Sequence, residues 1–294
     1  MRQTEETKQT EETMKVSGFT ICRNAVAFDY PIVEVLRSAL PIVDEFIVNV
    51  GQSDDGTLDL IRSIGSEKIR IVESVWDDNL KKDGLLFSIE TNKALARCTG
   101  DWALYLQADE VLHERDYETI RRTLRDHLDD PRVLGFTFRY LHFYGDYRSV
   151  NPWFYHRAVR IIRNDGQVES CGDAVGFWLK TDRGYLQSIH RDRVRPSGAT
   201  IYHYGWVKPA TVLLEKFRYQ VARHHGEQPG PEQARMLART AYEFEDYDIM
   251  KTFTGSHPAV MAERVRTYPV LKPGRNRWLN PAFYRAVLKR GFRG

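Results

Sequence analysis

The chain has 294 residues, of which 42% are hydrophobic and 12% aromatic, and its formal net charge is +3. This is ample for one large folded domain, and a net charge so close to zero excludes a polyelectrolyte that binds nucleic acid through its overall charge. Three widely spaced cysteines without a CxxC pair argue against a disulfide framework or a zinc site, and no segment approaches the roughly 20 apolar residues that cross a bilayer, so we expect a soluble cytoplasmic protein, at most peripheral to the inner face of the membrane.

The chain opens with a polar repeat, QTEETK followed by QTEETM, which predicts a disordered leader over residues 1–14. From residue 15 onward, strand and helix patterns alternate. Strands are expected at residues 16–22, 46–50, 69–72 and 102–106, and helices at residues 32–40, 57–64 and 85–97. This order predicts an α/β fold with a doubly wound, mixed but mostly parallel sheet that carries helices on both faces.

Beyond residue 110 the pattern becomes aromatic and less regular. Helices are expected around residues 117–124, 211–223 and 233–244, and strands at residues 135–144, 159–162, 176–179 and 200–204. We expect one domain over residues 15–263 and a helical extension over residues 264–294, with a helix at 283–288. This basic tail holds nine Lys or Arg and no Asp or Glu. Its amphipathic helix either lies on an anionic membrane surface or packs on the domain with a basic outer face.

Polar side chains gather where three of the expected strands end. They are Arg23 and Asn24, the run from Asn49 to Thr57, and the run from Gln107 to Glu110. In open parallel sheets, ligands bind at these carboxyl ends. The usual GxGxxG and GxxxxGK[ST] fingerprints are missing. Asp109 and Glu110 together predict a divalent cation that carries a phosphorylated ligand, and the alternative is a solvated acidic turn.

Four segments, in order, resemble motifs of family 2 glycosyltransferases of the GT-A fold. They are CRN at residues 22–24, GQSDDGT at 51–57, TNKA at 91–94 and GDWALYLQADE at 100–110. The resemblance covers residues 16–110 and, more weakly, 159–208. It implies a GT-A-like sheet and a metal-dependent, inverting hexosyltransferase. Such an enzyme moves sugar from a nucleotide-sugar donor, with a UDP-sugar favoured, to a hydroxyl of a glycan or lipid-linked acceptor in cell-surface polysaccharide biosynthesis.

The resemblance also implies roles for particular residues. Asp109 and His203 would hold Mn²⁺ or Mg²⁺, although Gln107 stands where the family usually has the first Asp of a DxD motif. Asp173 would be the catalytic base, with Glu169 as the second choice. The residues expected to contact the nucleotide or its metal are Arg23, Asn24, Asn49, Asp54, Asp55, Asn92, Gln107 and Ala108.

Two other functions stay open, and a third is not expected. The neutral Gln107 favours a catalytically silent relative that binds sugar nucleotides or glycans. A sugar nucleotidyltransferase would use a similar sheet, but no glycine-rich loop with a nearby Arg or Lys follows the first strand. Nucleic-acid binding is not expected, since no helix-turn-helix, zinc or RNP-like pattern is present.

Overall fold

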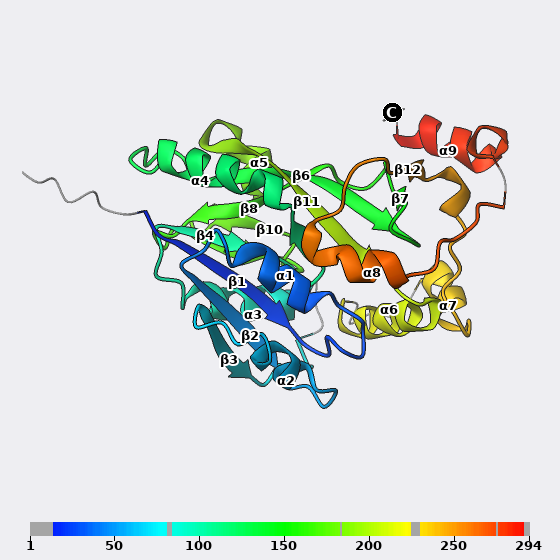
Figure 1. The fold of residues 1–294 in the computed structure, drawn as a ribbon, viewed down its shortest axis with the longest axis horizontal. Coiled ribbons are helices and arrows are strands. Elements are labelled where there is room, and N and C mark those ends of the chain that lie inside the picture. Colours follow the sequence, from blue (N-terminus) through cyan, green and yellow to red (C-terminus); the bar gives the residue numbers. More distant parts are fainter. Residues whose placement is uncertain (1–13, 81–83, 183, 225–229, 275, 291–294) are drawn as a thin grey trace, which may run out of the picture.

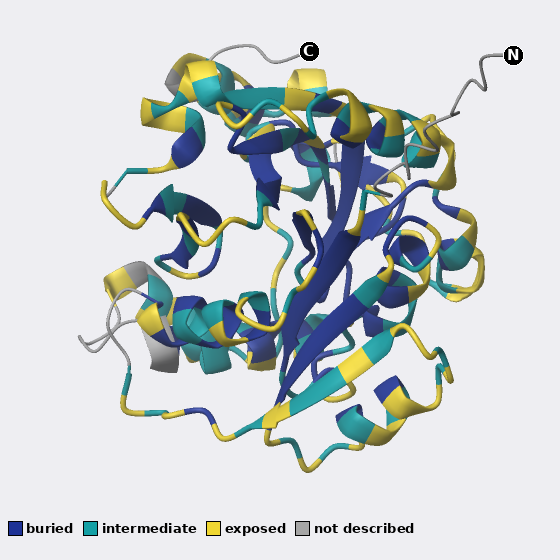
Figure 2. Cartoon of the chain, turned by 90° about the vertical axis from the view of Figure 1, so that its left-hand side faces the viewer, coloured by how far each residue is buried: buried dark blue, intermediate teal, exposed yellow. Residues whose placement is uncertain are grey.

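The fold is that of a computed structural model, which describes residues 14–80, 84–182, 184–224, 230–274 and 276–290 (Figure 1). The predicted disordered leader, apart from Met14, lies outside the described residues. A mixed sheet forms the centre of the molecule, and its central strands are buried, whereas strands at its edges are partly exposed (Figure 2). The α/β prediction with a mixed, mostly parallel sheet is confirmed.

One half of the sheet is wholly parallel and has the strand order β3-β2-β1-β4. Its strands are β1 (Val16–Cys22), β2 (Glu45–Gly51), β3 (Ile69–Ser74) and β4 (Trp102–Tyr105), connected by α1 (Ile32–Ala39), α2 (Thr57–Arg62) and α3 (Leu85–Leu95). Because these four strands run in the same direction, the polar segments that follow β1, β2 and β4 all lie at one edge of the sheet.

The other half continues from β4 through antiparallel and parallel pairs. Its strands are β5 (Glu110–Leu112), β6 (Gly135–Tyr144), β7 (Ser149–Val150), β8 (Arg157–Arg163), β11 (Val194–Trp206) and β12 (Lys251–Thr252), and a separate hairpin consists of β9 (Val168–Cys171) and β10 (Gly176–Leu179). β5 pairs antiparallel with β11, with Glu110 opposite His203. This pairing brings the acidic segment after β4 beside a histidine that lies far away in the sequence.

Alternation along the strands divides the core between the two faces of the sheet. On β2, Phe46 and Val48 pack with residues of α1, whereas Ile47 packs with Ala94 of α3 on the other side. The prediction of helices on both faces is therefore confirmed. The remaining α-helices are α4 (Tyr117–Asp126), α5 (Leu186–Ile189), α6 (Ala210–His224), α7 (Pro231–Leu237), α8 (Ala262–Thr267) and α9 (Pro281–Arg290).

The predicted helix over residues 233–244 is wrong beyond Leu237, where α7 ends. The rings of Tyr242 and Phe244 pack 5.1 Å apart, and both belong to one cluster with Tyr144. Residues two apart do not face the same side of a helix. A non-helical backbone therefore lets both rings reach this cluster.

The C-terminal segment packs on the domain. Arg264 in α8 forms ion pairs with Asp29 at 2.7 Å and with Glu34 of α1 at 3.0 Å. In α9, Phe283 is buried in the cluster that contains Tyr144. The predicted basic tail thus begins inside a segment that is tied to the sheet. Within the described ranges, none of the helices has the length and apolar character to span a membrane.

Candidate functional site

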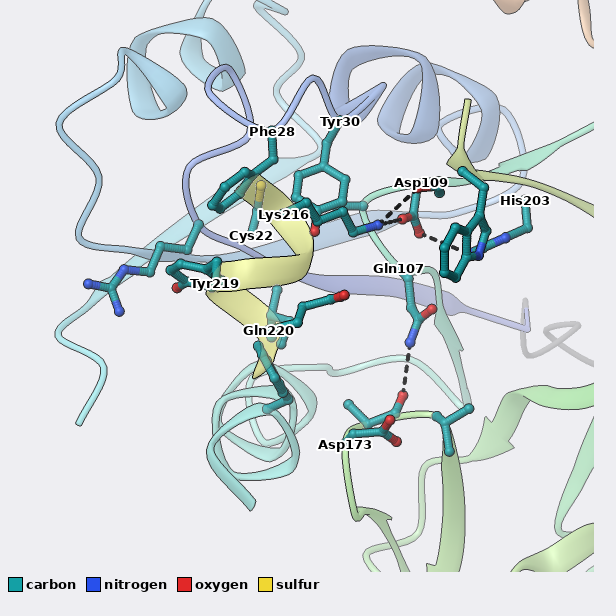
Figure 3. A pocket seen from close by; sticks show the side chains of 18 of the residues that line it. Cys22, Phe28, Tyr30, Gln107, Asp109, Asp173, His203, Lys216, Tyr219 and Gln220 are labelled. Atoms are coloured by element: carbon teal, nitrogen blue, oxygen red, sulfur yellow. Dashed lines mark hydrogen bonds and ion pairs between the residues drawn. The ribbon is translucent and has the colours of Figure 1, made fainter. Parts of the chain in front are cut away.

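A cavity of about 410 Å³ opens at the carboxyl ends of β1 and β4 (Figure 3). Its walls come from the ends of β1 and β11, the segment after β4, the turn between β9 and β10, and α6. Six of the residues predicted from sequence or resemblance line it: Arg23, Gln107, Ala108, Asp109, Asp173 and His203. The fold therefore brings together six of the twelve predicted site residues, although Arg23 and His203 lie 180 positions apart in the sequence.

Asp109 lies in the wall of this cavity and is only 5% exposed. Its Oδ2 accepts a hydrogen bond from the Lys216 ammonium at 3.0 Å, and its Oδ1 lies 3.5 Å from His203 Nε2. Burial alone would raise the pKa of this carboxyl group, but the charge and hydrogen bond of Lys216, together with the charge of Lys208, outweigh burial and hold the pKa well below its usual value. Asp109 is consequently a carboxylate at neutral pH.

Lys216 reaches Asp109 from α6, whose inward face also presents Tyr219 and Gln220 to the cavity (Figure 3). Residues three and four apart share one face of a helix, which explains the spacing of these three side chains. The Lys216 ammonium also donates to the carbonyl oxygen of Gly205 at 3.2 Å. A Cβ atom on Gly205 would lie 2.7 Å from Asp109 Oδ2, so this close approach requires glycine.

A second lysine, Lys208, is fully buried behind the same carboxylate. It donates to the carbonyl oxygen of Asp29 at 2.7 Å, and its ammonium lies 4.5 Å from the centroid of the Tyr30 ring. Burial and the nearby charge of Lys216 lower the pKa of Lys208 to about 7. Lys216 lies over the same ring at 4.8 Å, and the charges of both lysines act on the Asp109 carboxylate.

His203 is held by a second histidine. Its Nδ1 lies 3.1 Å from His142 Nδ1, and His142 Nε2 lies 2.8 Å from the carbonyl oxygen of Tyr155. The carbonyl oxygen requires His142 Nε2 to donate, so in the neutral ring His142 Nδ1 accepts from His203 Nδ1. Burial lowers the pKa of both rings. Neutral His203 therefore turns an unprotonated Nε2 toward Asp109.

Glu110 follows Asp109 in the sequence but points away from the cavity. It is fully buried and forms a bidentate ion pair with Arg160, with Nε–Oε2 and Nη2–Oε1 distances of 2.8 Å. Tyr140 donates to Oε1 at 2.7 Å, and the backbone N–H of Gln107 donates to Oε2 at 3.1 Å. All of these partners hold Glu110 in a structural role, so it supports the turn that presents Asp109.

Gln107 connects this turn to the β9–β10 hairpin, because its Nε2 donates to the carbonyl oxygen of Ala174 at 3.3 Å (Figure 3). The turn of the hairpin carries Asp173, which is exposed and lines the cavity. Glu169, on β9, instead accepts from Trp178 Nε1 at 2.9 Å and is not among the cavity residues. Of the two predicted bases, only Asp173 faces the cavity that contains Asp109.

Arg23 contributes a cation at another wall of the cavity. Its guanidinium pairs with Asp78 at 2.8 Å, donates to the carbonyl oxygen of Gln52 at 3.0 Å, and lies 5.8 Å from the centroid of the Trp76 ring. The rings of Phe28 and Tyr219 pack 4.9 Å apart at the same end of the cavity, where Figure 3 shows them beside each other. This end offers flat apolar surfaces next to a positive charge.

The other predicted nucleotide contacts have structural partners outside the cavity lining. Asn49 is fully buried, and its amide donates to Glu90 and accepts from Ser74 Oγ at 2.6 Å. Asn92 forms two hydrogen bonds with the backbone of Ser170, at 3.0 and 2.8 Å.

Three more predicted contacts lie around the start of α2. Asp55 accepts from the backbone N–H groups of Thr57 and Ala27 and so fixes the start of that helix. Asp54 is exposed in the turn just before it. Asn24 adopts a left-handed backbone with φ of 55°, and its N–H donates to Ser53 Oγ at 3.0 Å.

The donor set around Asp109 does not fit a resident divalent cation. Gln107 is neutral and bonded to the hairpin, Glu110 is committed to Arg160, and Asp109 already has an ammonium group at 3.0 Å. No group of three or more His, Cys, Asp or Glu that could hold a metal ion occurs among the residues that the structure describes. Hard divalent cations favour several charged oxygens, and here one carboxylate faces two lysines. The prediction of Mn²⁺ or Mg²⁺ thus has no geometric support.

Lys216, Lys208 and Arg160 are not among the residues predicted from the sequence. Each sits in an otherwise apolar or aromatic surrounding, and a buried cation needs an anionic or aromatic partner. Lys216 lies at an inward position of α6 between Leu213 and Phe217, which also line the cavity. A lysine on the apolar face of a predicted helix was therefore the available signal.

Comparisons with known proteins give limited matches. No protein-family model matches the chain. It is 36% identical over 103 residues to a TPR repeat-containing protein of Synechococcus elongatus, which covers 35% of this chain and 22% of that protein. It is 28% identical over 136 residues to an uncharacterized glycosyltransferase of Rickettsia typhi, which covers 46% of this chain and 41% of that protein. The chain thus spans less than half the length of these curated relatives.

Among solved structures, the chain aligns with S. aureus TarS 1-349 in complex with UDP, with a TM-score of 0.41 and 15% identity over 77% of this chain and 70% of that one. It also aligns with the same fragment in complex with UDP-GlcNAc, with a TM-score of 0.40 and 16% identity over 77% of this chain and 71% of that one.

Proposed function

We propose that the protein is an inverting glycosyltransferase that moves a sugar from a nucleotide-sugar donor to a hydroxyl group of an acceptor. The observation that carries this proposal is the cavity at the carboxyl ends of β1 and β4. There the Asp109–Lys216 ion pair and the exposed carboxylate of Asp173 line one space. A negatively charged leaving group needs a cation, and an acceptor hydroxyl needs a base, and this cavity offers both.

Two independent lines support the proposal. All four segments that resemble family 2 glycosyltransferases contain residues at the cavity or bonded to its walls: Arg23, Gln52, Asn92 and the run from Gln107 to Asp109. In addition, the relative from Rickettsia typhi, 28% identical over 136 residues, is described as a glycosyltransferase. For this chain, both the transferase activity and its substrates are part of the proposal.

The residues would divide the reaction between them. Asp173 takes the proton from the acceptor hydroxyl, whose oxygen forms a new bond to the anomeric carbon of the sugar. The bond between that carbon and the β-phosphate oxygen breaks, and its electron pair stays on the diphosphate. Arg23 and Lys216 line the cavity as the cations that face this diphosphate, and the rings of Phe28 and Tyr219 offer surfaces for stacking. A UDP-sugar is the donor that the family resemblance favours.

The test incubates the purified full chain with a panel of nucleotide sugars. Transfer or slow hydrolysis is detected through the nucleoside diphosphate that is released. We expect turnover with one donor class. Asp173→Asn should lower kcat by about 100-fold or more, since general-base catalysis contributes about 10²–10⁴. Glu169→Gln, on the same hairpin but outside the cavity, is the matched control and should keep most of the activity. The reverse ranking of these two variants would contradict the assignment of the base.

The neutral Gln107 keeps a second candidate, a catalytically silent sugar-nucleotide binder. The melting temperature of such a binder would rise with a nucleoside diphosphate, because a ligand that binds only the native state stabilises it. No donor would release a product. Product release that depends on Asp173 would exclude this candidate.

The acceptor that the resemblance implies is a glycan or a lipid-linked glycan, reached at a membrane surface. The end of the chain supports such contact, since it exposes Trp278, Leu279, Tyr284 and Leu288 beside Arg277 and Arg285. Apolar and cationic side chains together suit an anionic lipid surface. Co-sedimentation with vesicles that contain anionic lipid should exceed that with neutral vesicles, and replacing Leu279 and Leu288 by Ser should abolish the difference.

A further inference from the structure

Lys216 has a hydrogen-bonding arrangement that leaves it ready for an anion. An ammonium group has three donors and no acceptor. Two of them are used within the described part of the chain, by Asp109 Oδ2 at 3.0 Å and by the carbonyl oxygen of Gly205 at 3.2 Å. The side chain lines the cavity, so its remaining donor is available to a ligand there.

The position of this ammonium group is fixed by packing. The residue is 8% exposed, and its ammonium lies over the Tyr30 ring at 4.8 Å and within hydrogen-bonding distance of both Asp109 and Gly205. A charge that is already held in place needs no reorganisation when negative charge develops on a bound ligand. Lysine is also a common phosphate binder that acts as a point charge.

The same arrangement works against a metal ion. A divalent cation on Oδ1 of Asp109 would share this carboxylate with Lys216, and Lys208 adds further positive charge, as its effect on the pKa of Asp109 indicates. The neighbouring side chains do not offset this repulsion, because Glu110 pairs with Arg160 and Gln107 carries no charge.

We propose that the Lys216 ammonium, held by Asp109, takes the place of a divalent cation, so that the donor diphosphate binds and leaves without metal. This inference rests on the proposed function for its ligand. In the transfer step, Lys216 would donate to the diphosphate oxygen that receives the electron pair when the bond to the anomeric carbon breaks. Asp109 acts as a positioning residue for the ammonium group.

Loss of the Lys216 ammonium group should change which cation Asp109 binds. Once the ammonium is removed, Asp109 Oδ1 and the unprotonated His203 Nε2 remain, 3.5 Å apart, as two ligands that face each other. Lys216→Met should therefore acquire a Mn²⁺ site that the natural chain lacks. Lys216→Arg keeps the charge and should not acquire it.

The first experiment measures Mn²⁺ binding without nucleotide, from the loss of the free-ion electron paramagnetic resonance signal. We expect no stoichiometric binding by the natural chain, one equivalent bound by Lys216→Met, and loss of that equivalent in the double variant with Asp109→Asn. Lys251→Met, which removes a charge from an exposed lysine, is the control and should behave as the natural chain. One equivalent of Mn²⁺ on the natural chain, lost in Asp109→Asn, would overturn the inference.

The second experiment measures binding of UDP, GDP, ADP, CDP and dTDP by calorimetry, in EDTA and in Mn²⁺. For the diphosphate that binds, we expect the Kd values of the natural chain to agree within about threefold in the two conditions. This corresponds to a difference in binding free energy of less than about 1 kcal/mol. Lys216→Met should bind at least about tenfold more weakly in EDTA and recover in Mn²⁺. Binding by the natural chain only with Mn²⁺ would overturn the inference.

These outcomes separate this inference from the proposed function. Failure of every diphosphate under both conditions would contradict the donor site, whereas the resonance experiment still decides whether Lys216 excludes a metal. Circular dichroism melts check that the variants fold. If Lys216→Met does not fold, the measurements on the natural chain alone still decide whether a metal is needed.

Discussion

Asp109 and Glu110 are adjacent in the sequence and lie in opposite environments. Glu110 is fully buried behind the turn and is bound by Arg160, Tyr140 and a backbone N–H group. Asp109 lines the cavity and is bound by Lys216, with His203 at 3.5 Å. Both carboxylates have a cation beside them, yet only one of the two cations faces space that a ligand could fill.

The difference lies in the geometry of the two cations. Arg160 directs two nitrogens at Glu110 and donates through Nη1 to the carbonyl oxygens of Val159 and Val175. A guanidinium that is satisfied in this way can only support structure. Lys216 is a point charge with one donor left over beside the cavity. Two adjacent acids at the end of a strand can thus have different roles. One stabilises the turn, and the other faces the site where a ligand would bind.

The largest expected effect comes from breaking the structural pair. Arg160→Met keeps much of the side-chain volume but leaves the Glu110 carboxylate buried without its cation. Removing one partner of a buried ion pair typically costs about 3–5 kcal/mol of unfolding free energy. Urea unfolding followed by circular dichroism measures this loss. Glu110→Gln in the same background should restore part of the stability, and no recovery would show that the charge of Glu110 is not the cause.

Breaking the cavity-facing pair should affect activity more than stability. We expect Asp109→Asn to lower turnover by about 100- to 1,000-fold, in the range seen when one preorganised electrostatic contact is lost. The unfolding free energy should fall by less than about 3 kcal/mol, since one charged hydrogen bond is weakened and the ammonium can turn toward water in the cavity. Parallel measurement of kcat and of urea unfolding tests this. A stability loss as large as that of Arg160→Met would remove the distinction between the two acids.

The sequence predicted the framework well and the partners poorly. Periodicity located β1, α3 and β6 to within about two residues, because apolar alternation and helical spacing are local signals. The resemblance located Asp109 and His203, which the pairing of β5 with β11 brings together. It could not reveal that Lys216 takes one oxygen of Asp109, since that contact joins residues 107 positions apart and depends on how α6 packs.

Asn92 sharpens the comparison, because it lies outside the cavity lining but secures one of the cavity walls. Its two hydrogen bonds tie α3 to Ser170 in β9, the hairpin that carries Asp173. Asn92→Ala leaves those backbone groups without partners and should cost about 1–3 kcal/mol. If Asn92 positions the hairpin, the variant should lower kcat and leave Kd for the nucleoside diphosphate nearly unchanged. A large loss of diphosphate affinity would instead favour the direct contact that the resemblance implies.

The smallest effect separates the two lysines behind Asp109. Burial lowers the pKa of Lys208 to about 7 in the folded protein, below the ordinary value of 10.5 for an unfolded chain. Between these two values the unfolded state binds more protons, so this residue makes stability rise with pH across that window, by at most about 1.4 kcal/mol per pH unit. Below about pH 7 both states are charged and the full cost of the buried ammonium is present. The unfolding free energy of Lys208→Met, relative to that of the natural chain, should therefore be highest at pH 6. It should fall as the pH rises to 9. Urea unfolding of both proteins at a series of pH values measures the difference, and a difference independent of pH would mean that Lys208 stays charged throughout this range.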